Sequence, residues 1–363
     1  MRQAPITKGM TKRITAVILL LLCAIPSIAQ HTTDQGNSFA DKVLDGTKGI
    51  IKGTRDFIEK NFDARDSVYI SPNLYNLTIM PQYSYCYDYY RFSAHDSEQS
   101  ITLTPGSSNK IGLYFGWRWI FLGYGIDVSG NSPQTDFNFS FYTAAVGIDL
   151  FYRKRSEGYT IRRLNGFYQN GNEELTDFNR RFDGLTVKQN GVNLYYIFNN
   201  KRFSYRAAYS QTTNQRISTG SFILGLTYNE QEFLFDHSRF DTPIREQLDN
   251  ELKFENVRYK DFSINFGYSY NWVFKKDFLA NISLTPAIGY KNTSLNMKSS
   301  KEFLSSINFD LITRAAVVYN NSRYYIGTSL VSHTYSYNKS TFSILNGFGV
   351  INVYFGVNFW RRK

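Results

Sequence analysis

From residue 66 to the end of the chain, apolar and polar residues alternate with a period of two. Tyr85, Tyr87 and Tyr89, for example, fall on one face of an extended strand, and Asp88 falls on the other. Successive side chains of a β-strand point to opposite faces, so this pattern predicts strands that each have one apolar face. The pattern recurs with short connections along the rest of the chain, and we therefore expect an all-β protein.

The length and the ends of these strands favour a membrane. The alternating segments run on the order of 10–12 residues, which matches a tilted strand that crosses a bilayer. Aromatic residues gather at the strand ends, as in the interfacial girdles of membrane barrels. After residue 30 no stretch of 18 apolar residues occurs, which excludes a bundle of membrane-spanning helices. The sequence predicts a transmembrane antiparallel up-and-down β-barrel; a soluble sandwich, which also alternates, is the alternative.

The number of strands is predicted as about 12–14. Single-chain bacterial barrels have an even number. A short strand at Ile101 and Leu103 would raise thirteen segments to fourteen, which we favour; if one segment does not cross, the number is twelve. The thirteen segments lie near residues 75–91, 109–117, 120–128, 135–142, 145–153, 186–198, 202–211, 219–229, 261–273, 278–290, 307–319, 323–336 and 347–360.

The N-terminal region reads as an export signal and a lead-in. Lys12 and Arg13 precede a short apolar run, and Ser27-Ile28-Ala29 resembles a cleavage site, so residues 1–29 are predicted to be a signal peptide. A single spanning helix and a lipoprotein cysteine at Cys23 are the alternatives. Residues 30–65 form a predicted periplasmic lead-in with an amphipathic helix at 38–62, and residues 66–363 form the barrel. This arrangement predicts a location in the bacterial outer membrane.

The end of the chain and its charge suggest partners. The strand that ends at Trp360 resembles the C-terminal signal read by the barrel-assembly machinery, although three basic residues follow it. The formal net charge is +11, and the predicted signal carries four basic and no acidic residues, which leaves +7. Such an excess favours anionic lipid headgroups or anionic solutes, or is an ordinary loop surface. Nucleic acid is an improbable partner for an exported chain.

Disulfides, metals and cofactors are not indicated. Without the signal, Cys86 is the one cysteine, and it can form neither an internal disulfide nor a cysteine-based metal site. The histidines His31, His95, His237 and His333 are not spaced as metal ligands. Nucleotide-binding, nucleophile-elbow and zinc-protease motifs are missing, so no cofactor is expected.

His333 is the one candidate for catalysis. It follows Ser332 and shares a strand face with Ser329, and a histidine beside a hydroxyl can activate a nucleophile when an acid orients its ring. No such acid lies nearby in the sequence. The alternative is a wall histidine that bonds to a neighbour.

A set of charges has the parity of the barrel lumen. A charge that faced lipid at mid-depth would cost roughly 2–4 kcal/mol for arginine, so these side chains are expected to point inward. They can line a pore that selects ions, or they can pair across the interior into a network that braces the wall. Their mixed signs favour the network. The set consists of Asp88, Asp127, Asp149, Arg206, Asp310 and Arg314.

Several short motifs resemble one uncharacterised family. They are Asp66-Ser67-Val68-Tyr69-Ile70, the run from Leu103 to Trp119, Gly147-Ile148-Asp149-Leu150-Phe151-Tyr152 and the run from Ser218 to Gly225. Together they are similar to the family called domain of unknown function 4421, over about residues 66–360. The resemblance implies an outer-membrane β-barrel and implies no reaction.

The sequence therefore predicts the class of protein better than its activity. The leading hypothesis is a non-enzymatic outer-membrane barrel in contact with outer-membrane lipid, either a passive or gated small-solute pore or a structural envelope protein. One alternative is a lipid-modifying enzyme that uses His333. The other is a surface receptor or adhesin that uses the charged connections at 154–185 and 230–260, which are expected to fold over one rim.

Overall fold

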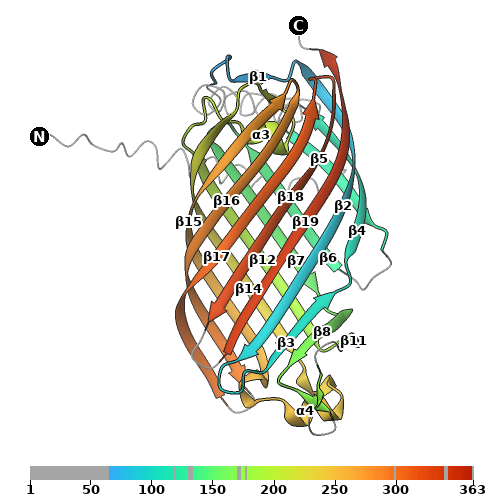
Figure 1. The fold of residues 1–363 in the computed structure, drawn as a ribbon, viewed down its shortest axis with the longest axis vertical. Helices are drawn as coiled ribbons and strands as arrows, with labels where there is room; N and C mark the ends of the chain where they lie inside the picture. The colour runs from blue at the N-terminus through green and yellow to red at the C-terminus, as the bar shows by residue number, and fades with distance from the viewer. Residues whose placement is uncertain are drawn as a thin grey trace, which may run out of the picture. The chain divides into compact units, whose positions relative to one another are not determined.

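The computed structural model describes residues 65–117, 120–129, 134–169, 173–175, 178–297, 300–338 and 342–361. The predicted signal peptide and the helix predicted at 38–62 lie outside these residues. Within them the chain is almost entirely antiparallel sheet, as predicted, and Figure 1 shows that the sheet curls into a barrel.

Within the described residues twelve strands form the barrel wall, which is the lower end of the predicted range and not the fourteen that the sequence favours. Hydrogen-bonded neighbours follow the order β5-β4-β2-β19-β18-β17-β16-β15-β14-β12-β7-β6. The wall strands are β2 (Tyr75–Ala94), β4 (Ser108–Trp117), β5 (Ile120–Asp127), β6 (Gln134–Tyr142), β7 (Val146–Arg155), β12 (Leu185–Ile197), β14 (Thr219–Phe235), β15 (Phe254–Lys275), β16 (Phe278–Met297), β17 (Ser300–Asn320), β18 (Tyr324–Asn338) and β19 (Phe342–Arg361).

The first and last strands of the wall pair with each other. Tyr75 lies opposite Arg361 in the β2–β19 ladder, so the barrel begins and ends at the same mouth, the upper one in Figure 1. The strands β5 and β6 are the two ends of the hydrogen-bonded path, and no ladder joins them in the described part of the chain. Side chains from β7 and β2 bridge this seam, as described below.

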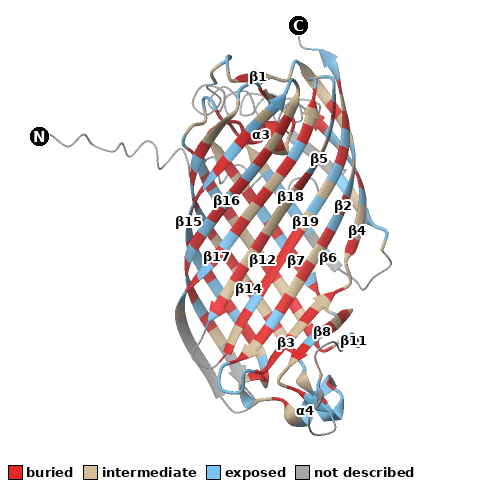
Figure 2. Cartoon of the chain, viewed as in Figure 1, coloured by how far each residue is buried: buried red, intermediate tan, exposed pale blue. Residues whose placement is uncertain are grey.

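The outer face of the wall is apolar. Along β15, Phe262, Ile264 and Phe266 are 66%, 60% and 52% exposed, whereas the residues between them are buried (Figure 2). Leaving such side chains in water is unfavourable, and a continuous belt of them on a barrel is the surface that lipid covers. The belt makes this a transmembrane β-barrel.

Tyrosines cover two glycines on this outer face. Tyr87 and Tyr89 of β2 lie over Gly349 and Gly347 of β19, where an added Cβ would lie 2.3 and 2.7 Å from the tyrosine rings. Tyr87 Oη reaches across β19 and donates to Ser332 of β18 at 3.2 Å. The small residues therefore let an aromatic side chain lie flat across a strand and join three strands.

A short helix and a two-stranded sheet close the upper mouth. They are α3 (Tyr205–Tyr209) and the pair β1 (Ile70–Pro72) with β13 (Thr213–Gln215), called the plug below (Figure 1). A strand was predicted at 202–211, and this prediction is wrong. Phe203, Tyr205 and Ala207 alternate with polar residues as in a strand, but the segment turns inward after Ile197 and is buried as a helix.

A folded cap covers the lower mouth. Its strands are β3 (Ser100–Pro105), β8 (Tyr159–Asn165), β9 (Tyr168–Gln169), β10 (Glu173–Glu174) and β11 (Arg180–Phe182), and its helices are η2 (His237–Arg239), α4 (Thr242–Gln247) and η3 (Asn250–Leu252). The predicted strand at Ile101 and Leu103 is therefore real. It pairs antiparallel with the lower end of β2 and with β8 of the cap, and it adds no strand to the twelve of the wall.

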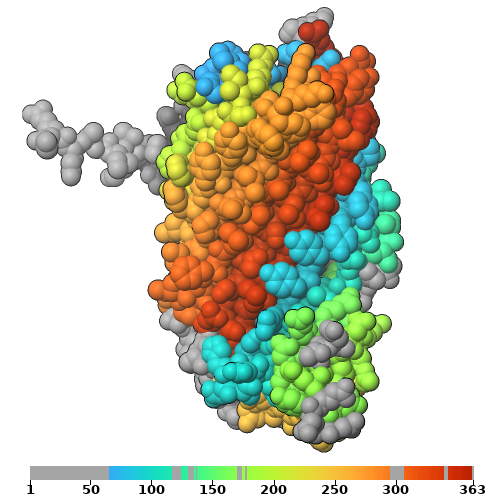
Figure 3. Space-filling view, in the orientation of Figure 1, coloured from blue at the N-terminus to red at the C-terminus, as the bar shows by residue number. Residues whose placement is uncertain are grey.

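The cap has the main hydrophobic core of the molecule. Twenty-four buried residues contact one another there, from the cap and from the inner faces of β2, β12, β14, β15, β18 and β19. Phe92, Phe235 and Phe254 form its centre, with ring centroids 5.1–5.5 Å apart. The core thus fills the lower end of the barrel itself, and Figure 3 shows the cap packed closely against the wall strands.

Candidate functional site

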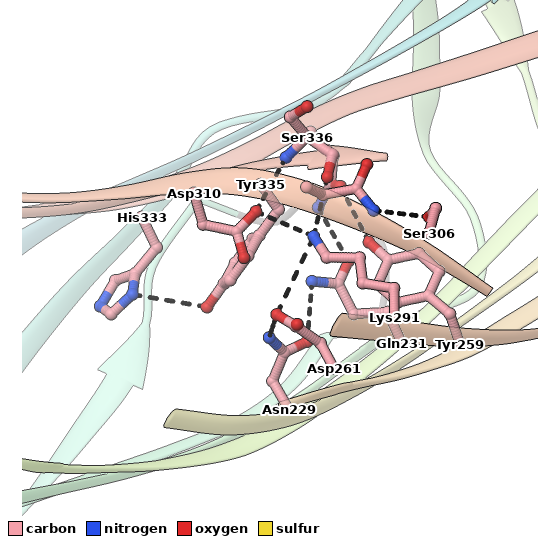
Figure 4. A network of polar contacts seen from close by, with 12 residues as sticks. Asn229, Gln231, Tyr259, Asp261, Lys291, Ser306, Asp310, His333, Tyr335 and Ser336 are labelled. Carbon is pink, nitrogen blue, oxygen red and sulfur yellow. Dashed lines mark hydrogen bonds and ion pairs between the residues drawn. The ribbon is translucent and has the colours of Figure 1, made fainter. Parts of the chain in front are cut away.

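The barrel interior is the candidate functional site, because the buried charges gather there. Its lower part contains Lys291 of β16, whose Nζ donates to Asp310 Oδ1 at 2.8 Å and to the Ser336 carbonyl at 2.8 Å (Figure 4). The carboxylate of Asp261, on β15, lies 3.9 Å from the same ammonium. All three charged side chains are at most 3% exposed.

Amides complete this lower network. Asn229 donates to Asp261 Oδ2 at 2.8 Å, Gln231 donates to Asn229 at 3.2 Å, and Asn346 donates to Gln231 at 2.9 Å. The chain of contacts links β14, β15 and β19 (Figure 4). Burial of a charge is costly unless it is paired and hydrogen-bonded, and this arrangement pairs Lys291 and bonds one oxygen of each carboxylate, while Asp261 Oδ1 and Asp310 Oδ2 have no hydrogen-bond partner in the described residues.

A second ion pair spans the middle of the barrel. Arg314 of β17 donates to Asp149 of β7 at 2.5 Å, although five strand steps separate β17 from β7 along the wall. Ser140 donates to the same carboxylate at 2.7 Å, and the guanidinium lies 5.5 Å from the Tyr195 ring centroid. The cavity beside Arg314 has a volume of about 10 Å³, the room of a single water molecule.

A third ion pair bridges the β5–β6 seam. Arg153 of β7 donates to Asp88 of β2 at 2.6 Å, and both side chains are 5% exposed. The Arg153 guanidinium also lies 4.2 Å from the Phe348 ring centroid, on β19. The seam that lacks a backbone ladder is therefore joined by an arginine that contacts both a carboxylate and an aromatic ring.

His333 lies in an aromatic cluster near this pair. Its ring is buried and stacks on Phe348, with centroids 4.8 Å apart, and its Nδ1 is 3.4 Å from Tyr335 Oη. Ser332 lies on the outer face, where it accepts the hydrogen bond from Tyr87, and Ser329 accepts one from Asn352. Neither hydroxyl bonds to the imidazole. The structure therefore favours the interpretation of His333 as a histidine of the wall that contacts its neighbours.

Two of the six predicted lumen charges lie elsewhere. Asp127 ends β5, is exposed, and accepts hydrogen bonds from the hydroxyls of Ser108 and Ser129. It has the inward parity, but β5 ends before the wall does and leaves the carboxylate at an edge. Arg206 is buried, but it belongs to α3 of the plug rather than to a wall strand.

Sequence reasoning missed Lys291 and Asp261. Both have the inward parity, because they adjoin the outward residues Tyr290 and Phe262. The predicted strand at 278–290 stopped one residue before Lys291, and Asp261 was the first residue of another. Extending the same alternation by a few residues would have found both.

Side-chain hydrogen bonds attach the plug to the wall. Tyr205 Oη lies 2.5 Å from Ser283 Oγ, and Tyr209 Oη donates to Asn281 at 2.7 Å. On the other side, Gln211 donates to Tyr354 Oη at 2.8 Å. These bonds join the plug to β16 and β19 at the upper mouth, while the lower end is filled by the cap core.

A surface hollow of about 490 Å³ lies on the cap. Two of its carboxylates, those of Asp183 and Asp236, are already hydrogen-bonded. A hydrogen bond from the Gly158 amide lowers the pKa of Asp183, and a hydrogen bond from Ser238 lowers the pKa of Asp236. Arg239 donates to Asp236 at 3.0 Å. These groups hold turns of the cap together.

In the described residues, no cluster of three or more histidine, cysteine, aspartate or glutamate side chains is arranged to hold a metal ion. No helix in this part of the chain is both long and apolar enough to span a membrane.

These features define a transmembrane β-barrel whose described residues place a helix, ion pairs and an apolar core inside the wall. The chain belongs to the family described as domain of unknown function (DUF4421), whose model matches residues 64–359. No curated protein matches the sequence.

Solved structures with similar architecture include three bacterial proteins. The outer membrane protease OmpT from Escherichia coli has a TM-score of 0.38 and 8% identity, over 80% of this chain and 98% of that one. The translocator domain of the autotransporter NalP from Neisseria meningitidis has a TM-score of 0.30 and 8% identity, over 88% and 98%. The toluene transporter TodX from P. putida has a TM-score of 0.26 and 9% identity, over 79% and 91%.

Proposed function

We propose that this protein is a closed, non-conducting barrel that serves as a structural component of the bacterial outer membrane. The observation that carries the proposal is that inward charges pair with one another, either across the interior or between neighbouring strands, instead of lining an open path. Arg314 reaches Asp149, Arg153 reaches Asp88 and Lys291 reaches Asp310, each within 2.8 Å. A pore that selects ions needs charged groups free to meet a solute, and these groups already meet one another.

The two mouths support the same proposal. The plug fills the upper one and the cap core fills the lower one, so a solute would have to displace folded structure at either end. A predominantly hydrophobic core of twenty-four residues is an expensive structure to open, because its apolar area would return to water.

The outer membrane is the proposed location. The apolar belt requires lipid, and a single-chain barrel with an even number of strands is the type found there. Both ends of the barrel lie at one mouth, since Tyr75 and Arg361 are paired neighbours. This mouth is the periplasmic one in the proposal, because the long connections of the cap at the other mouth fit the extracellular side. Outer-membrane lipid is the lasting partner, and the barrel-assembly machinery is the expected partner during insertion.

Single-channel recording in a planar bilayer tests this proposal. The refolded full chain is expected to give no steady conductance, because the interior is filled at several levels. Folding is checked on the same sample by the difference in gel mobility between heated and unheated protein, and a general porin serves as the positive control for the bilayer. Steady, ion-selective conductance from the folded barrel would overturn the proposal and favour a pore.

A variant without the plug tests whether the plug acts as a gate. Replacing residues 203–215 with a flexible Gly-Ser segment removes α3 and β13 but leaves the charge network and the cap core. This variant is also expected to be silent. Conductance that appears only in this variant would show that the plug is a gate, and the protein would then be a gated pore rather than a closed structure.

A further inference from the structure

The outer face of the wall changes from apolar to charged in three successive rows near the cap. The rows are read from residues that lie directly opposite one another on β7, β12, β14 and β15. The first row, inside the lipid belt, is Leu150, Val192, Tyr228 and Phe262; the second is Tyr152, Asn190, Glu230 and Lys260; the third is Lys154, Lys188, Glu232 and Arg258.

Basic side chains outnumber acidic ones in the second and third rows. Four basic residues face two glutamates, and each glutamate has already bound one of them. Lys188 donates to Glu232 at 2.8 Å, and Arg258 forms an ion pair with Glu230. Lys154 and Lys260 are exposed, and neither forms an ion pair within the described residues. The surface thus presents two ammonium groups beside two neutralised pairs.

One position in the third row brings a second lysine beside the Lys188–Glu232 pair. Lys154 and Lys188 lie directly opposite each other on neighbouring strands, and both side chains are on the outer face. Like charges in such a position repel each other, because their Cβ atoms are roughly 5 Å apart. Glu232 offsets this repulsion at Lys188, and a bound anion would add a favourable contact for the ammonium group of Lys154.

The depth of the three rows in the membrane indicates which class of anion binds there. They adjoin the aromatic edge of the lipid belt, and they lie at the mouth opposite the paired ends of the barrel. This is the depth at which lipid headgroups meet a membrane protein, and basic residues there attract anionic lipids. On the proposed orientation, which rests on the proposed function, this leaflet is the outer one.

We propose that Lys154, Lys188, Arg258 and Lys260 form a binding surface for the phosphate groups of an anionic lipid in the outer leaflet, of the phosphorylated glycolipid type. The lipid chains lie against the belt of Tyr228 and Phe262, and the phosphates meet the ammonium groups beside them. The barrel then holds a shell of such lipid on the side of β7, β12, β14 and β15.

Lipid retention measured by native mass spectrometry tests this surface. The full chain, refolded in a maltoside detergent, is titrated with bisphosphorylated lipid A and, in a second arm, with lipid A from which both phosphates have been removed. The variant Lys154→Gln/Lys260→Gln removes two charges that support no ion pair of the fold. Each lysine near such a surface contributes about 1 kcal/mol, so binding of the phosphorylated lipid is expected to weaken about 30-fold.

The matched control is Lys201→Gln/Lys276→Gln. It removes the same charge from two exposed lysines near the other mouth, one after β12 and one in the turn between β15 and β16, and should leave lipid binding unchanged. Equal weakening in the control, or equal binding of the dephosphorylated lipid, would overturn the proposal. Full competition by millimolar inorganic phosphate would also overturn it, because the site would then recognise a free anion.

The outcome is separable from that of the proposed function. A folded barrel that gives no conductance and shows no preference for the phosphorylated lipid contradicts the proposed lipid-binding surface but not the proposed closed interior. A barrel that conducts contradicts the proposed closed interior. The lipid-binding surface is then tested separately, by comparing the lysine variant with its control variant and the phosphorylated with the dephosphorylated lipid.

Discussion

The Arg314–Asp149 pair is the residue-scale test of whether the interior charges brace the wall. Arg314→Met would leave a buried carboxylate without its cation, which costs about 3–5 kcal/mol of unfolding free energy. The variant Arg314→Met/Asp149→Asn removes both charges and should lose much less than the sum of the single changes. Urea unfolding in detergent micelles measures the four members of this double-mutant cycle.

The hydrogen bond from Ser140 affects the stability expected for the double variant of that cycle. Ser140 donates to Asp149, and an asparagine there can still accept this bond, so the double variant keeps part of the network. Single changes that add without coupling would show that the two charges do not stabilise each other. The barrel would then be held by its backbone ladders and cap core alone.

Parity in the sequence identifies inward charges but not their partners. Asp88, Asp149, Asp310 and Arg314 alternate with outward apolar residues, and all four are buried in the structure. Their partners come from strands distant in sequence, for example Arg314 and Asp149 at a separation of 165 residues. Only the closure of the sheet decides which inward residues face one another, and a periodic pattern contains no such information.

At the scale of elements, α3 shows where periodicity misleads. A helix on a surface shows one apolar stripe, but α3 is enclosed by the barrel, and Tyr205, Arg206, Ala207 and Ala208 are all buried. A helix of five residues that is buried on all sides carries no period that distinguishes it from a strand. The positive φ of Gln211, 57°, then turns the chain into β13, which pairs with β1.

The attachment of α3 can be tested by removing hydroxyl groups. Tyr205→Phe/Tyr209→Phe deletes the bonds to Ser283 and Asn281 and keeps both rings, so each change should cost about 0.5–1.5 kcal/mol of local stability. Amide hydrogen exchange is expected to become about 5- to 100-fold faster in α3 and to stay the same in β16 and β17.

Tyr85→Phe is the control for that measurement. Tyr85 is on the outer face of β2 and is 36% exposed, so the loss of its hydroxyl should leave exchange in α3 unaltered. Unchanged exchange in the double variant would mean that the apolar contacts of Ala207, Ala208 and Tyr209 hold the plug without these bonds.

At the scale of the whole molecule, the segments that the sequence presents as loops are the most deeply packed. Residues 154–185 and 230–260 were expected to fold over one rim, and they supply much of the cap. Their apolar residues, such as Phe182, Phe240 and Leu252, enter the same core as the wall residues Phe92 and Phe254. The sequence does not reveal this core, because its apolar residues are divided among short strands and turns such as those of Phe182, Phe240 and Leu252, between charged residues.

This shared core predicts that cap and barrel unfold together. Phe235 lies at the end of β14, with ring centroids 5.4 Å from Phe92, 5.8 Å from Phe182 and 5.1 Å from Phe254. Phe235→Ala should cost about 3–5 kcal/mol and shift one single unfolding transition, because cap and wall lose contacts at the same time. Denaturant unfolding in micelles, followed both by far-ultraviolet circular dichroism and by proteolysis of the cap, measures the transition.

Phe309→Ala is the matched change on the outer face. Phe309 is 68% exposed on β17, where detergent or lipid already solvates the ring, so its loss should change the unfolding free energy far less than the loss of Phe235. Two separate transitions for Phe235→Ala, with cap proteolysis preceding loss of the barrel signal, would contradict the single unit. The cap would then be an independent surface domain carried by a barrel that is stable without it, and its hollow would be the first place to look for a ligand.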